Sequence, residues 1–517
     1  MIESEDWVTP RFNYTNRFEK PILYYWLAAT SYKVFGTSEF SARLPSALSG
    51  LALSFLSLII GSQLFNKRVG LLAGTITATS FGIILMGRQA LPDLPLAFFV
   101  SLTTWSAFCA GRPHDQELLP EGNHSPTRLH WSILCGLSAG AGFLMKGPVA
   151  LILPTLILSP FLIRRLFLKR TPSRLRQDLQ LFCIGVAIFL IVSTPWFYLM
   201  VNEHGMGYLE RFFLTENLDR FLTDQYNSPR PWWYYIPIVF GGLLPWSLFS
   251  LCWLKDLFEK IRPDKENLFL IWWATAPFVF FSLSGGQQPR YVLPLIIPLA
   301  LLLAKTAHQQ LDTPGQNKST LFSLSTILAG GIFILLGMII SNATPLFFQW
   351  SPAFMLSSSI LIATSGIGIC LTTFRPAWTV LSIATAVSVT TIVIHTFILD
   401  TPNVSPVEKM AALIEQHGGS SSRYGRHAVL NRNLIFYTKK EFIELPILKA
   451  ASDLLTEPEP ILCVLRETDV ELLEDQGILL SRLAEVSSLN IGGINLRSLL
   501  NPSADAIQKI ILVTNAS

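Results

Sequence analysis

Long apolar runs separated by short polar or charged segments dominate the first 400 residues of the chain. A helix needs roughly 20 apolar residues to cross a bilayer, and shorter runs suffice where a helix tilts or the bilayer thins. The pattern therefore predicts an all-α polytopic membrane domain over residues 44–400. About twelve spans are expected, at residues 44–65, 69–86, 94–111, 131–145, 149–163, 179–201, 232–254, 268–283, 291–304, 321–340, 353–374 and 378–399.

The pattern changes at the end of the chain, over residues 401–517, which are polar and contain no spanning run. Short apolar stretches at 461–465 and 510–513 predict strands, and residues 469–475 predict a helix. We interpret this tail as a small α/β domain outside the cytoplasm.

The first 43 residues form a juxtamembrane segment. Residues 21–36 are apolar and aromatic but too few to cross a bilayer. We expect a helix that lies at the outer membrane interface, where tyrosine and tryptophan side chains favour the headgroup region. From this segment alone, a membrane anchor without chemistry is the simpler interpretation.

Composition agrees with a membrane protein. Half of the 517 residues are hydrophobic, 14% are charged and the mean hydropathy is +0.44. An ordinary soluble chain has about 25% charged residues. The net charge of +4 and the absence of a structured basic block argue against nucleic acid as a partner. The six cysteines have no paired spacing, so neither a disulfide framework nor a zinc cluster is indicated.

The lysine and arginine residues of the short loops set the orientation. They gather in alternate loops, near residues 67–68, 164–176, 255–265 and 305–318. Because cytoplasmic loops carry the excess of positive charge, these loops are assigned to the cytoplasm. The N-terminal segment, the turn at 88–93, the loop at 202–231, the turn at 285–290 and the tail then lie outside.

Several ionisable residues stand at the outer ends of the predicted spans. Each has a plain structural explanation, as a helix cap, an interfacial anchor or a snorkelling side chain. Their common location favours a cavity that binds a phosphate, a sugar and a lipid tail, to which the outer loop adds Glu216 and Arg220. The candidates are Glu19, Lys20, Arg88, Asp93, Lys146, Arg290 and Tyr291.

Read in order, a series of short motifs resembles one group of membrane glycosyltransferases. The motifs are DWVTPR at 6–11, RFEKP at 17–21, LYYW at 23–26, FSARLPSA at 40–47, LPDLPL at 91–96, KGP at 146–148, PWWYY at 231–235, LPWS at 244–247 and the segment 282–294. They resemble the aminoarabinose (lipid A) transferases and their relatives in the protein O-mannosyltransferase superfamily, which have the GT-C fold. The resemblance covers about residues 5–310.

The resemblance implies a reaction at the outer face of a bacterial inner membrane. Such enzymes transfer a sugar from an undecaprenyl- or other polyprenyl-phosphate carrier to a hydroxyl of a lipid A-like glycolipid or a protein. It implies that Lys20 binds the lipid phosphate, that Tyr291 lines the cavity, and that Glu19 and Asp93 are its catalytic acidic residues. Arg290 is inferred as a second cation from its neighbour, and Arg88 and Lys146 are added as substrate-binding residues. No cofactor beyond the lipid-linked donor is expected.

The chain departs from this family pattern at two places. Family members have an acidic pair at the outer end of a first span, before the position of Met1 here. We expect that codons upstream of Met1 encode this further span, and the alternative is an inactive protein. Relatives also have a zinc-binding histidine just before the motif at 231–235, where this chain has none. We therefore expect no bound metal.

Two other classes of protein stay open. A transporter would show two similar halves and charges near the bilayer midplane, whereas no internal repeat is visible and the charges stand at span ends. A membrane scaffold would use the tail to bind a partner. The sequence names neither the sugar nor the acceptor.

Overall fold

The protein is described here by a computed structural model. It describes residues 1–111, 127–167, 171–223, 230–259, 264–311, 320–342, 352–395, 406–419, 423–430, 433–489 and 507–515. The chain divides into two compact units. The first comprises Met1–Arg11, Asn16–Ala329 and Ile369–Ala384, and the second comprises Phe12–Thr15, Gly330–Gly368 and Thr385–Ser517.

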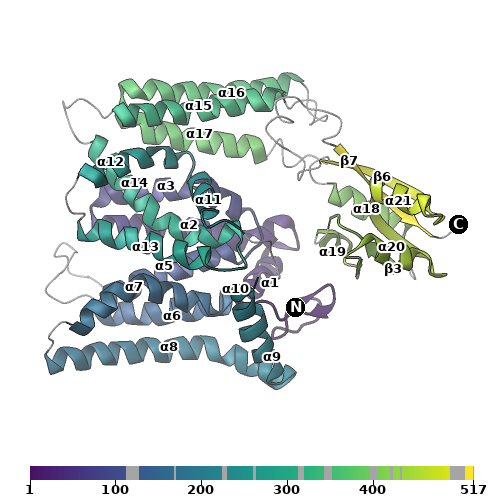
Figure 1. Cartoon of the computed structure of the whole chain (residues 1–517), viewed down its shortest axis with the longest axis horizontal. Helices are drawn as coiled ribbons and strands as arrows, with labels where there is room; N and C mark the ends of the chain where they lie inside the picture. The colour runs from purple at the N-terminus through teal and green to yellow at the C-terminus, as the bar shows by residue number, and fades with distance from the viewer. Residues whose placement is uncertain are drawn as a thin grey trace. The chain divides into compact units, whose positions relative to one another are not determined.

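Within the described residues, every predicted apolar run coincides with one helix or with consecutive helices, and the end of the run at 378–399 lies outside them (Figure 1). These are α2 (Glu39–Leu64), α3 (Lys67–Ala78), α4 (Phe81–Gly87), α5 (Asp93–Ala110), α6 (Arg128–Lys146), α7 (Val149–Phe167), α8 (Pro172–His204), α11 (Tyr235–Gly242), α12 (Ser250–Glu259), α13 (Lys265–Ser282), α14 (Ile296–Leu311), α15 (Thr320–Asn342), α16 (Pro352–Leu371) and α17 (Thr379–Val393).

Fewer helices meet the requirements for a span than the twelve predicted. Among the described residues, six helices are long and apolar enough to cross a membrane, or eight if each bent pair counts as one span. The bent pairs are α3–α4, at 54°, and α11 with residues 246–255, at 106°. The prediction of a multi-span helical domain is confirmed, and the count of twelve is not.

Small residues let α6 approach its neighbours closely. This helix contacts both α5 and α8 (Figure 1). A Cβ atom on Gly136 would lie 2.4 Å from the Gly185 carbonyl oxygen, and one on Gly140 would lie 2.7 Å from Cβ of Val192. Glycines four residues apart on one helix face are typical of tight helix pairs in membranes.

Residues 21–36 fold as predicted into a helix, α1 (Leu23–Phe35). Its aromatic side chains tie it to the rest of the first unit. Trp26 Nε1 donates a hydrogen bond to the Trp7 carbonyl oxygen at 2.8 Å, and the Tyr24 hydroxyl lies 3.1 Å from Ser46 Oγ. The position of α1 at the membrane interface stays a prediction.

The tail contains the predicted α/β fold. Its five-stranded sheet has the order β4-β3-β5-β7-β6, with β4 (Ile443–Glu444), β3 (Arg423–Arg426), β5 (Ile461–Arg466), β7 (Ile507–Thr514) and β6 (Ser481–Leu489). Strands β3, β4 and β5 are parallel, and β7 is antiparallel to β5 and β6. The predicted strands at 461–465 and 510–513 and the helix at 469–475 are thus confirmed as β5, β7 and α21 (Glu467–Asp475).

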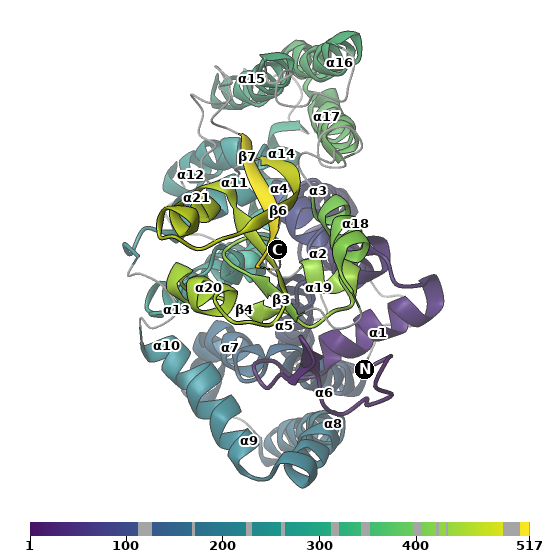
Figure 2. The ribbon, with the colours of Figure 1, turned by 90° about the vertical axis from the view of Figure 1, so that its right-hand side faces the viewer.

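Helices cover both faces of this sheet (Figure 2). α18 (Val407–His417) and α19 (Asn433–Thr438) pack on one face, and α20 (Leu448–Leu455) and α21 pack on the other. The predicted domain boundary at residue 400 and residues 224–229 of the predicted outer loop lie outside the described residues.

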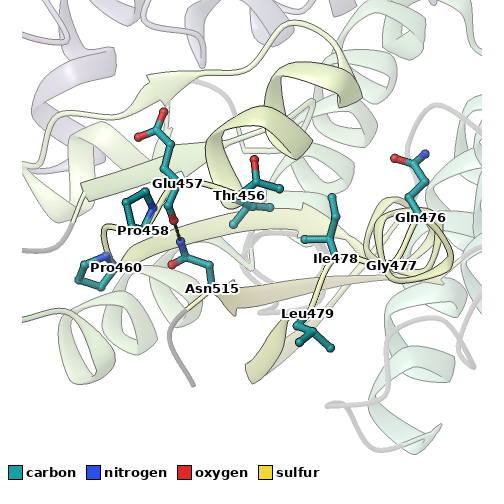
Figure 3. Close-up of a pocket in the computed structure, with 10 residues that line it drawn as sticks. Thr456, Glu457, Pro458, Pro460, Gln476, Gly477, Ile478, Leu479 and Asn515 are labelled. Atoms are coloured by element: carbon teal, nitrogen blue, oxygen red, sulfur yellow. Dashed lines mark hydrogen bonds between the residues drawn. The ribbon is translucent and has the colours of Figure 1, made fainter.

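The sheet domain has an open groove of about 690 Å³ beside the start of β5 (Figure 3). Asn515 is one of the residues that line it, and its Nδ2 donates hydrogen bonds to the carbonyl oxygens of Glu457 and Glu459. None of the predicted site residues lines this groove.

Candidate active site

Asp93 contacts two other predicted site residues, Lys146 and Arg290, which are far from it in the sequence. It is the first residue of α5 and only 5% exposed. Nζ of Lys146, the last residue of α6, donates a hydrogen bond to Oδ1 at 2.5 Å. Arg290 Nε, from the 3-10 helix η3 (Pro289–Leu295), lies 3.1 Å from Oδ2, although the two are not aligned as a hydrogen bond. Two cations compensate the buried carboxylate, which would otherwise be costly.

The aromatic ring of Tyr291 packs against the ammonium group of Lys146. The ammonium of Lys146 lies 4.2 Å from the centroid of the Tyr291 ring, within the range of a cation–π contact. Phe281 packs on the same ring with centroids 5.3 Å apart. The lysine is thus held between a carboxylate and an aromatic face.

The turn after Lys146 brings in a further segment. Gly147 has φ +80°, which favours glycine, and α7 begins two residues later. A Cβ atom there would lie 2.7 Å from Phe212 Cζ. Phe212 belongs to the π-helix η1 (Arg211–Asp219), so η1 packs directly on the turn that carries Lys146.

Glu19 forms an ion pair with Arg17, with Nη2 and Oε2 2.8 Å apart. Burial raises the pKa of Glu19, but the hydrogen bond and charge of Arg17, followed by the charges of Lys20 and Arg220, outweigh it and leave the pKa lowered. Glu19 is therefore an ionised carboxylate, 41% exposed at its side chain.

Lys20 differs from the other cations of the site. None of the described residues forms a hydrogen bond or an ion pair with its ammonium group. Burial, with the charges of Lys146 and Arg220, lowers the pKa of Lys20 to about 7, although Asp93 and Glu216 act in the opposite direction. An anion bound beside this lysine would restore its charge, so the position suits a phosphate.

Arg88 follows α4 as its C-cap, at the beginning of the turn that leads to Asp93. Its part in substrate binding stays a prediction.

Three further charged residues belong to the surroundings of the site, and of these Glu216 and Arg220 were expected at the cavity from the sequence, whereas Arg17 was not. Arg17 pairs with Glu19, and Glu216 of η1 lies 3.7 Å from Arg220 of α10 (Arg220–Leu222). The charges of Glu216 and Arg220 act on Lys20. The spacing of four residues between Glu216 and Arg220 on a helix favours this ion pair.

The expected absence of a metal stays a prediction. In the part of the chain that the structure describes, no three His, Cys, Asp or Glu side chains lie close enough together to hold a metal ion. His204 ends α8, with Nε2 2.8 Å from Thr9 Oγ1, which also donates a hydrogen bond to Glu203.

Apolar helices around a buried carboxylate, a cation cluster and an aromatic ring define a multi-span membrane protein with a polar site. Residues 19–198 match the family model described as dolichyl-phosphate-mannose-protein mannosyltransferase. The whole chain superposes on 92% of ArnT from Cupriavidus metallidurans, solved with bound undecaprenyl phosphate, with a TM-score of 0.73 and 21% identity. This similarity shows the GT-C fold.

Sequence relatives point to the same group. The chain is 32% identical over 343 residues to undecaprenyl phosphate-alpha-4-amino-4-deoxy-L-arabinose arabinosyl transferase 1 of Pseudomonas fluorescens, covering 66% of this chain and 58% of the relative. It is 32% identical over 313 residues to the corresponding transferase of Pseudomonas paraeruginosa, covering 60% of this chain and 54% of the relative. The chain thus spans less than two thirds of these relatives.

In sequence and in fold the chain is thus similar to the GT-C membrane glycosyltransferases, which include the aminoarabinose transferases and the protein O-mannosyltransferases.

Proposed function

We propose that the protein transfers a sugar from a polyprenyl-phosphate carrier to a hydroxyl group of a lipid A-like glycolipid or a protein. The proposal rests on Lys20, a partly buried lysine that has no ion-pair partner among the described residues and lies beside a cluster of cations. The names of the relatives and the undecaprenyl phosphate of the similar structure support it.

The cations have a defined task in this reaction. The donor is a phosphodiester with one negative charge, and cleavage of its sugar–oxygen bond leaves a second charge on the departing lipid phosphate. Lys20, Lys146 and Arg290 stabilise this developing charge because they are held in place before the bond breaks. Asp93 positions Lys146 and Arg290, a narrower role than the catalytic one that its motif implies.

The acceptor hydroxyl loses its proton as its oxygen attacks the anomeric carbon. A carboxylate is the expected base. Of the two predicted acidic residues, Glu19 is more accessible than Asp93, which is buried and held between two cations. We therefore assign proton transfer to Glu19 and charge positioning to Asp93.

We place the reaction at the outer face of a bacterial inner membrane, with the tail domain on the same side. The distribution of lysine and arginine over the short loops supports this orientation.

The test is sugar transfer by the protein in lipid nanodiscs, made from its native locus. Undecaprenyl-phosphate donors that carry different radiolabelled pentoses and hexoses are supplied with lipid A or a cell-envelope protein extract. The proposal is supported if the wild type forms labelled acceptor and the Lys20→Ala variant does not. Passage of the donor across a vesicle membrane without transfer would favour a transporter instead.

A further inference from the structure

Three polar groups beside the proposed phosphate site are buried without a hydrogen-bond partner among the described residues. They are Glu216 Oε2, Gln287 Oε1 and the Tyr235 hydroxyl, on side chains that are 8%, 5% and 0% exposed. A buried polar group without a partner is costly, and each such group in a folded protein asks for an explanation.

The first two groups belong to segments in direct contact. Glu216 lies one helical turn before Arg220, with which it forms an ion pair at 3.7 Å. A Cβ atom on Gly286 would lie 2.6 Å from the Arg220 carbonyl oxygen, and the backbone N–H of Gly285 donates a hydrogen bond to Phe221. Gln287 is the next residue after Gly286. The segment of η1 and α10, to which Glu216 belongs, therefore packs against the loop that contains Gln287.

The third group reaches the same loop from α11. The Tyr235 hydroxyl lies beside the backbone of Gln288. Tyr235 packs in one apolar cluster with Tyr291, the residue under Lys146. The loop at 285–291 therefore joins all three groups to the cation site.

The chemistry of these groups selects a kind of ligand. Carboxylate and amide oxygens accept hydrogen bonds, and a tyrosine hydroxyl both donates and accepts. Arg220 already compensates the charge of Glu216, which also acts on Arg17 and Lys20. An ammonium group would add another positive charge to this cluster, whereas a neutral hydroxyl would not.

We propose that Glu216, Gln287 and Tyr235 form the sugar-binding subsite of the donor and accept hydrogen bonds from sugar hydroxyls. The inference rests on the proposed function, since it needs a lipid-phosphate site beside it. It adds the part of the site that distinguishes a sugar-carrying donor from the bare lipid phosphate.

The experiment compares two ligands on the full chain in nanodiscs. Undecaprenyl phosphate and an undecaprenyl-phosphate hexose are titrated against the wild type, Glu216→Gln and Tyr235→Phe, with binding followed by native mass spectrometry. Both substitutions keep the shape of the side chain. Glu210→Gln is the matched control, because Glu210 is exposed in α9 (Gly207–Glu210), next to η1.

We expect each substitution to weaken binding of the hexose donor about 10-fold, the value of one well-placed hydrogen bond. Binding of undecaprenyl phosphate should be unchanged in Tyr235→Phe. In Glu216→Gln it should change less than binding of the hexose donor, because loss of the Glu216 charge removes a repulsion of the phosphate but also lowers the pKa of Lys20 further. The control should bind both ligands as the wild type does.

Other results would overturn the inference in distinguishable ways. Equal weakening of both ligands would mean that these residues only maintain the fold, and no weakening would mean that they do not touch the sugar. A third titration uses a donor that carries an amino sugar. If Glu216→Gln weakens binding of this donor more than binding of the hexose donor, the subsite binds an ammonium group instead. A wild type that binds no undecaprenyl phosphate would contradict the proposed function itself.

Discussion

Asp93 determines where two cations stand at the site. Its carboxylate binds Lys146 through Oδ1 and faces Arg290 through Oδ2, and it is almost entirely buried. An uncharged amide would fit the same space but would hold the two cations less firmly. Their mutual repulsion would then move them away from the departing phosphate.

Asp93→Asn should therefore lower the turnover rate about 10²- to 10³-fold, as is common when a preorganised charge contact is lost. Single-turnover kinetics in nanodiscs would measure it. Asp264→Asn is a suitable control, since Asp264 pairs with Lys305 at 2.8 Å and half of its side chain is exposed. Turnover at the wild-type rate in Asp93→Asn would show that the cations do not depend on Asp93.

Lys20 should make donor binding depend on pH. With its pKa lowered to about 7, Lys20 is largely neutral above pH 7, and a bound anion raises the pKa again. Binding above pH 7 thus takes up a proton, so the affinity for undecaprenyl phosphate should fall as pH rises from 7 to 9. The slope should approach tenfold per pH unit.

Thermal-shift titrations at several pH values would measure this slope. The lipid phosphate is already mostly doubly charged above pH 7, so its own ionisation adds little. Lys20→Ala should bind weakly at every pH and should lose the slope. An unchanged slope in Lys20→Ala would assign the pH dependence to another group.

At the scale of elements, the close approach of α6 and α8 depends on glycine. Gly136→Val would drive a branched side chain into the Gly185 backbone. We expect the unfolding temperature in detergent to fall by about 5 °C or more. Gly331→Val on α15 should change it little, because no atom lies within 4 Å of a Cβ there. Similar unfolding temperatures for the two variants would contradict this view of the packing.

Apolar patterning predicted the existence of the helices well but not where they break. Residues 69–86 read as one apolar run, yet they fold as two helices bent by 54° between Thr79 and Ser80. The Ser80 side chain bonds back to the Ile76 carbonyl oxygen, and the Phe81 backbone N–H bonds to Leu244. Leu244 is far from Phe81 in the sequence. The hydropathy pattern along the chain therefore gives no information about this contact.

The same reasoning applies to the site. Motif resemblance identified Asp93, Lys146 and Arg290 separately, but their ion pairs join residues 53 or more positions apart. Arg17 was missed because an isolated charge in an outer segment is usually solvated, and Glu216 was expected at the cavity only from its place in the outer loop. Only the packing of η1 on the turn at Gly147 brings Glu216 beside the site.

At the scale of the whole molecule, the orientation in the membrane is open to direct measurement. Leu479 is 91% exposed in the tail domain, and Lys67 is the exposed first residue of α3. In a background without cysteine, Leu479→Cys should react in intact spheroplasts with a thiol reagent that does not cross membranes. Lys67→Cys should react only after lysis. The reverse pattern would place the tail domain in the cytoplasm.

Binding of undecaprenyl phosphate to the purified protein tests the central claim most directly. Native mass spectrometry of the wild type and Lys20→Ala, with Asp264→Asn as the control, would measure it. We predict one bound lipid on the wild type and the control, and at least about tenfold weaker binding to Lys20→Ala. Equal binding by all three proteins, or none by the wild type, would contradict a lipid-phosphate site at Lys20 and the glycosyltransferase mechanism built on it.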